Sequence, residues 1–384
     1  MKIALVIEHF DPARGGRELS TAQLATGLAR RGQEVTIFCR NCSDACEGVR
    51  VLPLKAAGWD RSTRLSSFAR SVRGAAAEGQ FDIVHATLPI PGANVYQPRG
   101  GLVTAQASAA SRRRSGWRRL VAGLLQPLNP TRWKLRGYER RLVRDPAVMC
   151  LAVSEMVARE FMNYYARGER VRVVFNGVDV PDVPDEQRKA WREEIRRRVG
   201  VAPGSPMFLT VANNPALKGV PETLDAFAQW YHSPAGVPGS RLAIIGRKKV
   251  RRLRLQARKL RVGKEVVFAG PTDDIFAWYS AADACVLLSW YDACSRVVLE
   301  AARWAVPSVT TVYNGAAEVL SHGAGIVVSS PRDTAAVVKA LTQLADPAQR
   351  AKRAAACRDI ADELSMDRHV EGLLNAYREV TAEP

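Results

Sequence analysis

The sequence predicts an α/β protein with two doubly wound parallel sheets. Three observations support this prediction: short apolar runs typical of buried strands, helical periodicity between those runs, and a length of 384 residues, which suits two domains. Strands separated by helices favour parallel pairing, because a helical crossover returns the chain to the same edge of the sheet. Two such series in one chain predict two domains facing each other across a ligand-binding cleft.

The first series begins at the amino terminus. Residues 3–7 are a short apolar run, and residues 19–31 have the periodicity of a helix. Ser154 is a predicted N-cap, because its hydroxyl can accept from the first amides of a helix predicted at 156–165. The strands predicted in this half lie at residues 3–7, 35–38, 82–85, 149–153 and 171–175.

A second series of strands and helices follows residues 178–186, a segment with two prolines that is typical of an interdomain linker. We therefore expect one domain at residues 1–180 and another at 181–365. The strands predicted in the second half lie at residues 207–211, 242–245, 265–268, 284–288 and 308–311, and the helices at 221–231, 274–282 and 297–304.

The chain has 56 basic and 38 acidic residues, a formal net charge of +18, which favours nucleic acid or an anionic membrane face as a partner. No uncharged run reaches the roughly 18 residues of a membrane-spanning helix, and the first seven residues are too short for a signal peptide. We therefore expect a cytoplasmic protein whose seven cysteines are reduced. Cys39, Cys42 and Cys46 do not have the spacing of a zinc site, so we expect no bound metal.

More than half of the basic excess lies in residues 112–144, which hold eleven basic residues and one acid, Glu139. Apolar residues recur there at helical spacing beside the arginines, a pattern typical of a helix lying on an anionic membrane. A helix packed on its own domain with a solvated polar face has the same pattern. A nucleic-acid-binding protein is another interpretation, although no nucleic-acid-binding motif is present. The candidate acceptor or membrane contacts are Arg112, Arg113, Arg114, Trp117, Arg118, Arg119, Trp133, Lys134 and Arg136.

Two loops carry candidate phosphate-binding groups. Gly15 and Gly16 follow the first predicted strand and precede a helix, where backbone amides and the positive helix end favour an anion. Such a glycine pair is also common in ordinary turns, and the three spaced glycines of a dinucleotide site are absent. Lys218 follows the first strand of the second half, so its ammonium is expected at the cleft; a solvated loop lysine is the alternative.

Asp292 and Glu300 are separated by seven residues, across the boundary between a loop and a helix. Because they follow a predicted strand, we expect both carboxylates at the carboxyl edge of the second sheet. The amides of Cys294, Ser295 and Arg296 are expected to be exposed at the start of the helix. Two carboxylates beside free amides can bind the hydroxyls of a sugar or a ribose.

Together these motifs resemble those of the retaining family 4 glycosyltransferases, which have the GT-B fold of two Rossmann-like domains. The resemblance covers nearly the whole chain and includes Ser154-Glu155, residues 176–179, Asn314-Gly315 with Glu318, and Gly325. It implies that Asp292 and Lys218 are catalytic. It also implies that the donor-binding residues are Gly15, Gly16, Lys218, Cys294, Ser295, Arg296 and Glu300, with Glu300 on the ribose, Lys218 on the diphosphate and Asp292 on the transferred sugar.

The resemblance further implies an acceptor-binding first domain, a donor-binding second domain and a C-terminal helix at 366–384 that returns to the first domain. It implies no metal, because fixed cations and amides can stabilise the departing diphosphate. The lipopolysaccharide core glucosyltransferases of this family also have a basic, aromatic, membrane-contacting stretch in the first domain. We therefore expect a UDP-sugar donor, a lipid-linked saccharide acceptor and peripheral association with the inner membrane face; a nucleotide-sugar epimerase of the same fold is the alternative.

The sequence departs from the family pattern around the expected donor sugar. Asp292 stands where glutamate is usual, which shortens the side chain by one methylene. Ser295 replaces a glycine and Arg296 an aliphatic residue, while Leu217 stands where an arginine is common. His85 is the candidate for the family's catalytic-loop histidine, with a purely structural role as the alternative.

Overall fold

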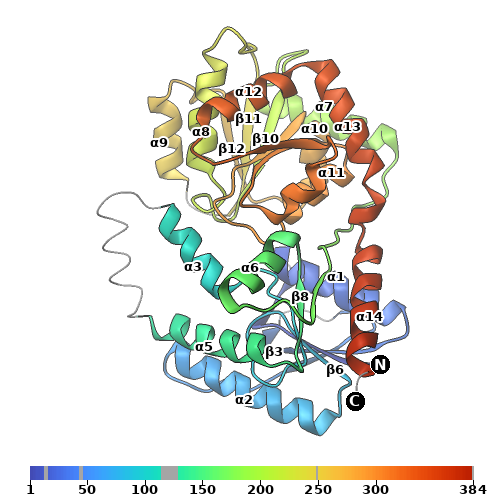
Figure 1. Ribbon diagram of the computed structural model, residues 1–384. Helices are drawn as coiled ribbons and strands as arrows, with labels where there is room; N and C mark the ends of the chain where they lie inside the picture. The colour runs from blue at the N-terminus through green and yellow to red at the C-terminus, as the bar shows by residue number, and fades with distance from the viewer. Residues whose placement is uncertain (13–15, 43–45, 114–128, 248–249, 383–384) are drawn as a thin grey trace. The chain divides into compact units, whose positions relative to one another are not determined.

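The computed structural model describes residues 1–12, 16–42, 46–113, 129–247 and 250–382. They form two compact units, here called the first unit (Met1–Val178 with Ser365–Pro384) and the second unit (Asp179–Leu364). Each unit has its own parallel sheet, and helices flank both sheets (Figure 1). The doubly wound α/β architecture predicted from the sequence is confirmed.

The first unit has a seven-stranded sheet in the order β5-β3-β1-β6-β7-β8-β9, in which every pair is parallel. Its strands are β1 (Lys2–Val6), β3 (Glu34–Cys39), β5 (Arg50–Pro53), β6 (Ile83–Ala86), β7 (Val95–Tyr96), β8 (Met149–Ala152) and β9 (Val171–Val173), with a separate pair β2 (His9–Phe10) and β4 (Asn41–Cys42). Its helices are α1 (Gly16–Arg30), α2 (Arg61–Gly79), α3 (Val103–Arg112), α5 (Pro130–Arg144), α6 (Glu155–Tyr165) and α14 (Met366–Ala382).

The second unit has a six-stranded parallel sheet in the order β12-β11-β10-β13-β14-β15. Its strands are β10 (Met207–Val211), β11 (Arg241–Ile245), β12 (Val266–Gly270), β13 (Ala284–Leu287), β14 (Ser308–Thr311) and β15 (Gly325–Val328). Its helices are α7 (Asp185–Val199), α8 (Val220–Tyr231), α9 (Arg251–Lys259), α10 (Ile275–Ala281), α11 (Arg296–Arg303), α12 (Thr334–Ala345) and α13 (Pro347–Asp359), with 3₁₀ turns η3 (Gly315–Leu320) and η4 (Asp362–Leu364).

The sequence correctly placed several of these elements. Ser154 caps α6, and its hydroxyl accepts from the Val157 amide at 3.3 Å. Helices predicted from periodicity are present as α1, α6, α8, α10 and α11. Within the described residues no helix is both long and apolar enough to cross a membrane.

In each sheet the direction of winding reverses once, and this reversal decides where a ligand can bind. In the first unit the reversal separates β1 from its neighbour β6, and in the second it separates β10 from β13. The loops that leave two such strands diverge, so a crevice opens at their carboxyl ends. Glu8 and Thr87 lie at this place in the first unit, as do Lys218 and Asp292 in the second.

A buried carboxylate stabilises the amino-terminal end of the β10–β13 pair, which is the end away from the crevice. Asp283 precedes β13 and accepts from the Met207 amide at the start of β10, at 2.8 Å. The guanidiniums of Arg192 and Arg196 lie 2.7 and 2.9 Å from its two oxygens. Burial raises the pKa of Asp283, but the neighbouring arginines outweigh burial and hold it below its usual value. The central strands are therefore held by an ionised group far from the crevice.

The carboxy-terminal helix α14 belongs to the first unit, where its apolar face joins the core formed by β1, β3 and α1. His85 on β6 is fully buried beneath this helix, and its Nδ1 lies 2.5 Å from the hydroxyl of Tyr377. Burial, helped by the positive charge of Arg99, lowers the pKa of His85 to about 3. His85 is therefore buried in this core and uncharged at neutral pH.

This pKa predicts that the protein loses stability in mild acid. The unfolded chain takes up a proton at His85 near pH 6.5 and the folded chain does not, so stability falls as the pH drops below 6.5. The slope is at most about 1.4 kcal/mol per pH unit for one such group. We expect His85→Gln to flatten the dependence of the urea-unfolding midpoint on pH between 7 and 5. The matched variant at exposed His322, His322→Gln, should keep the native slope; equal slopes in all three proteins would contradict the assignment.

Candidate active site

Lys218 and Asp292 form an ion pair at the carboxyl edge of the second sheet. Lys218 lies in the loop between β10 and α8, and Asp292 lies in the loop between β13 and α11. Their side chains are 21% and 16% exposed, so both are sheltered but still reachable from solvent. The structure thus brings together two residues that are 74 positions apart in the sequence.

Gly219 allows these two loops to touch. Its φ of +67° lies in the left-handed region, and a Cβ at this position would overlap with the carbonyl oxygen of Leu288. The contact is extended by a hydrogen bond from the Trp290 amide to the Leu217 carbonyl at 2.9 Å. Only a glycine permits this close approach without moving Lys218 away from Asp292.

The loop that carries Asp292 is held by the turn after β14. The Asp292 amide donates to the Tyr313 carbonyl, and the Asp292 carbonyl accepts from the Gly315 amide, both at 2.9 Å. Asn314 accepts from the Ser295 amide at 3.1 Å through its side-chain oxygen. This last bond corrects one expectation, because the Ser295 amide is buried and engaged within the protein instead of being exposed to a ligand.

Glu300 lies one turn into α11 and has two protein partners. The Arg296 guanidinium lies 3.1 Å from one carboxylate oxygen, and the Tyr279 hydroxyl donates to the other at 3.2 Å. Burial raises the pKa of Glu300, while Arg296 and Tyr279 oppose that rise. Tyr279 lies on α10 and had no signal in the sequence, since a tyrosine in a helix is usually only a core residue.

Several buried polar atoms at this edge have no hydrogen-bond partner among the described residues. They are Nε and Nη1 of Arg296 and the hydroxyl oxygen of Ser295. Leaving such donors unpaired is costly, so they indicate that a ligand or water completes the site. Two cations with free donors suit a phosphate group, and the nearby carboxylates suit hydroxyls. Within the described residues no group of three or more His, Cys, Asp or Glu side chains is placed to hold a metal.

The first unit has its own hollow at the ends of β1 and β6, which sequence reasoning did not identify. A cavity of about 340 Å³ is lined by residues that include Glu8, Thr87, Gly100 and Arg132. The Glu8 carboxylate lies 2.7 Å from the Arg40 guanidinium. Glu8 follows β1 directly, so the rule that ligands bind at strand ends was the signal that could have found it.

The candidate residues of the glycine loop and the basic segment are only partly described. Gly16 begins α1, Arg112 ends α3, and Arg113 follows it as the C-cap. Gly15, Arg114, Trp117, Arg118 and Arg119 lie outside the described residues. Trp133, Lys134 and Arg136 lie on α5, so the helical periodicity of this part of the basic segment is confirmed.

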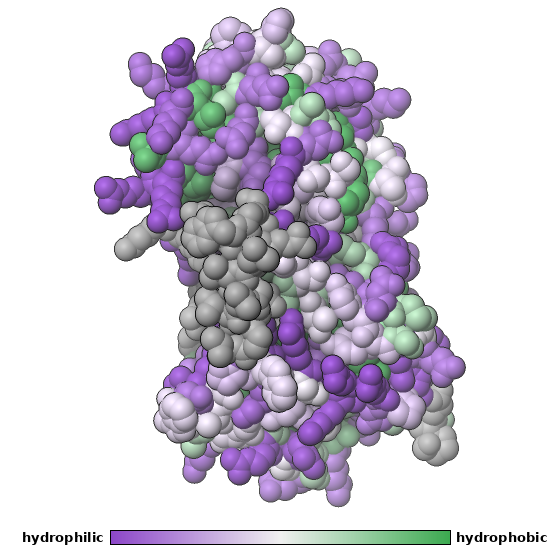
Figure 2. Space-filling model, turned by 60° about the vertical axis from the view of Figure 1, so that its left-hand side comes forward, coloured by the Kyte–Doolittle hydropathy of each residue, from purple (hydrophilic) through white to green (hydrophobic). Residues whose placement is uncertain are grey.

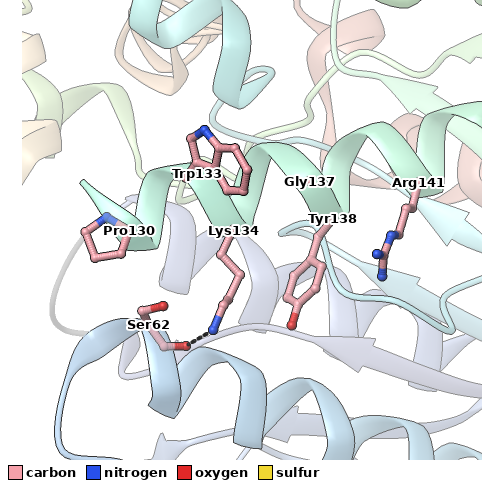
Figure 3. A pocket seen from close by; sticks show the side chains of 7 residues that line it. All are labelled: Ser62, Pro130, Trp133, Lys134, Gly137, Tyr138 and Arg141. Carbon is pink, nitrogen blue, oxygen red and sulfur yellow. Dashed lines mark hydrogen bonds between the residues drawn. The ribbon is translucent and has the colours of Figure 1, made fainter. Parts of the chain in front are cut away.

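Helices α5 and α2 enclose an open hollow of about 680 Å³ (Figure 3). Lys134, Tyr138 and Arg141 reach from α5 toward α2, and the Lys134 ammonium lies 3.4 Å from the Ser62 carbonyl. Trp133 is 73% exposed, which is unusual for so large an apolar side chain. The hollow therefore combines aromatic surface with two cations.

Glu139, the one acid of the basic segment, lies on the inner face of α5 and is fully buried. It accepts from the hydroxyls of Tyr96 and Tyr165 at 2.8 and 2.7 Å, and from the Val103 amide at the start of α3 at 2.8 Å. Burial raises its pKa, and these hydrogen bonds counteract the rise. One carboxylate thus ties the basic helix α5 to β7, α3 and α6.

Two family models match this chain: "Glycosyltransferase Family 4" at residues 14–181 and "Glycosyl transferases group 1" at residues 205–346. The two matches cover one unit each and together account for most of the sequence. The chain belongs to the family 4 glycosyltransferases. The resemblance predicted from the motifs is thereby confirmed, and the protein is an enzyme that transfers a sugar.

Similar proteins agree with this assignment. A D-inositol 3-phosphate glycosyltransferase from Xylanimonas cellulosilytica is 27% identical, over 99% of this chain and 97% of that protein. The crystal structure of WaaG, a glycosyltransferase involved in lipopolysaccharide biosynthesis, superposes with a TM-score of 0.80 at 20% identity, over 99% of both chains. Anabaena HepE in complex with UDP-glucose has a TM-score of 0.72 at 19% identity, over 98% of this chain and all of that chain. These structures confirm the predicted GT-B fold.

The contact at Gly219 generates a prediction for this family 4 site. Gly219→Ala should shift the loop, because the added methyl group meets a backbone carbonyl and the left-handed conformation disfavours alanine by about 1–2 kcal/mol. We expect a melting temperature lower by several degrees and loss of the Lys218–Asp292 contact. Gly204→Ala is the control, since Gly204 also has a positive φ, of +75°, but open space at its Cβ. A loss at Gly219 no larger than that at Gly204 would show that the loop contact is unimportant.

Proposed function

We propose that this family 4 enzyme is a retaining hexosyltransferase that transfers glucose from UDP-glucose to a lipid-linked saccharide at the cytoplasmic face of the membrane. The observation that carries the proposal is the group of two cations and two carboxylates at the β10–β13 crevice, with donors of Arg296 left unpaired. A nucleotide sugar requires the same groups: cations for its diphosphate and carboxylates for its hydroxyls. The UDP-glucose complex of the structural neighbour HepE supports this donor.

Each site residue then has a defined part in binding the donor. Glu300 accepts from the ribose hydroxyls, and Tyr279 keeps its carboxylate in place. Lys218 and Arg296 neutralise the diphosphate, and Asp292 accepts from a hydroxyl of the transferred sugar while its charge holds the Lys218 ammonium. The start of α11 at Cys294 and Ser295 adds the positive end of a helix. Gly15 and Gly16 are proposed as a further phosphate-binding loop at the start of α1.

The proposed catalytic effect is electrostatic. Breaking the bond between sugar and diphosphate leaves negative charge on the nucleotide, and Lys218 and Arg296, each held by an ion pair with a carboxylate, are proposed to stabilise that charge. Groups that need no reorientation during the reaction lower its barrier more than mobile ones do. The proposed mechanism relies on these charged groups and assigns no protein residue as a nucleophile.

The acceptor is proposed to bind to the first unit. The cavity at Glu8 and Thr87 has the polar lining that a saccharide needs, and α5 contributes Arg132 to its wall. The opposite side of the same helix carries the exposed Trp133 and the half-buried Lys134 beside the hollow of Figure 3. Aromatic and basic side chains together suit an anionic membrane surface, which supports an acceptor anchored in lipid. WaaG, one of the structural neighbours, is involved in lipopolysaccharide biosynthesis.

Removing either the proposed diphosphate contact, Lys218, or the proposed ribose contact, Glu300, should weaken nucleotide binding. We expect Lys218→Ala and Glu300→Gln each to raise the Kd of UDP at least tenfold, because each removes a hydrogen bond to a charged group worth about 1.5–3 kcal/mol. Titration calorimetry with UDP measures this directly. Lys189→Ala and Glu193→Gln on α7 remove the same charges from an exposed helix and should leave the Kd unchanged.

The same titration can refute the donor assignment. If native protein binds no uridine, guanosine or adenosine diphosphate, the crevice is not a nucleotide-sugar site. A protein that converts UDP-glucose into another UDP-sugar without any glycan acceptor would instead be an epimerase. Release of UDP that depends on an added glycolipid supports the transferase.

Asp292→Asn should separate binding from catalysis. The variant keeps a hydrogen-bonding side chain of equal size but loses the negative charge. Because Asp292 is proposed to contact the transferred sugar, which UDP lacks, the Kd of UDP should change less than threefold. We expect kcat to fall about a hundredfold, in the range seen when one group that stabilises a transition state is removed. The measurement is UDP release with acceptor at saturating donor. A variant with native kcat would show that Asp292 serves only the local structure.

A further inference from the structure

The second unit carries a basic segment of its own, which the donor site does not explain. Residues 247–264 contain ten lysines and arginines and no acidic residue. The helix at its centre, α9, spans Arg251–Lys259 and lies beside α8 at the edge of the unit (Figure 1). This segment is more densely basic than residues 112–144 and belongs to the other unit.

Helix α9 has one fixed face and one open face. Leu253 and Ala257, which are one turn apart, are buried in the core of the unit. Gln256 holds the helix to α8 by donating to the Pro221 carbonyl at 2.9 Å and to the Asp225 carboxylate at 2.8 Å. The remaining side chains of α9 therefore point outward from a firmly anchored helix.

The open face has an apolar centre with a basic border. Leu255 is 54% exposed. Its neighbours on the helix surface, three and four residues away on each side, are Arg251, Arg252, Arg258 and Lys259, and all four are exposed. Among the described residues none of these four cations has an ion-pair partner. The helix thus presents one leucine surrounded by four uncompensated positive charges.

Figure 2 brings forward the side that carries α9 in Figure 1. It shows the same combination of hydrophilic and hydrophobic side chains over a wider area of the surface. Long hydrophilic side chains cover much of the surface of the second unit, with a few hydrophobic residues between them. Another helix of the same unit, α7, differs, since acidic residues alternate with its basic ones. Helix α7 therefore lacks the uncompensated charge of α9.

We propose that α9 is a docking surface for an anionic lipid bilayer. Cations at the level of the lipid phosphates, with an apolar side chain inserted between them, match a bilayer, which has charge at its surface and hydrocarbon beneath. A nucleic acid offers no hydrocarbon layer into which Leu255 could insert, and α9 has no aromatic side chain on which a base could stack. The surface adds to the proposed function a second membrane contact, independent of α5 and of the donor site.

Binding of the full chain to vesicles tests this surface. Vesicles of zwitterionic lipid alone and with one third phosphatidylglycerol are sedimented with native protein and with R251Q/R252Q/R258Q/K259Q. Each cation near an anionic surface strengthens binding about fivefold, so the quadruple variant should bind the anionic vesicles at least tenfold more weakly. Leu255→Ser should weaken binding to the same vesicles about threefold or more at high salt, where the charges are screened.

A matched variant controls for total charge. K189Q/R197Q/K352Q/R358Q also lowers the net charge from +18 to +14, but at exposed positions of α7 and α13 in the same unit. It should bind anionic vesicles like native protein. All variants should keep the native Kd for UDP. If the native protein itself does not bind UDP, the donor-site proposal is wrong, but the proposal for α9 is unaffected.

The proposal is overturned if the α9 variant binds vesicles like native protein, or if the α7 and α13 variant loses as much binding. It is also overturned if only W133S/K134Q on α5 weakens binding, which leaves the first unit as the membrane contact. A variant that loses binding to duplex DNA or RNA but not to vesicles would assign α9 to nucleic acid instead. If L255S binds the vesicles like native protein, Leu255 does not insert into the bilayer and the proposal is wrong.

Discussion

The candidate active site depends on the close contact between two loops that leave adjacent central strands. The absence of a side chain at Gly219 lets its loop lie against the Leu288 carbonyl, and this contact holds Lys218 beside Asp292. At the other end of the same strands Asp283 bonds the start of β10. Because both ends are fixed, the charges at the crevice stay in place without a ligand, which is the condition for electrostatic catalysis.

The large positive charge of the chain has more than one physical role. Some arginines are structural, as Arg192 and Arg196 are when they compensate the buried Asp283. Arg296 lines the proposed donor crevice. Further cations are exposed on α5 and α9, and each of those helices is held by a polar side chain of its own, the buried Glu139 on α5 and the half-buried Gln256 on α9. Rigid helices that present unpaired cations suit a flat anionic surface better than mobile basic tails, because less conformational entropy is lost on binding.

Much of the fold could be predicted from the sequence, since buried parallel strands read as short apolar runs and helices as periodic ones. Helix α9 was not predicted: it is mostly basic and has only two buried residues, so its apolar periodicity is too sparse to detect. The candidate site was predicted in its main members, Lys218, Asp292 and Glu300, because each follows a strand. Tyr279 and Glu8 were missed, and the Ser295 amide was wrongly expected to be exposed, because their roles depend on partners distant in sequence.

By itself, the sequence determined the two α/β halves, the family, and the places along the chain where charged groups follow strands. Only the tertiary structure decided which of those groups meet. Strand order is set by the packing of helices on a sheet and not by the order of residues, so the adjacency of β10 and β13 cannot be read from the chain. Burial also depends on tertiary packing, and it makes Glu139 an anchor for α5 and leaves His85, a candidate functional residue in the sequence, uncharged in the core.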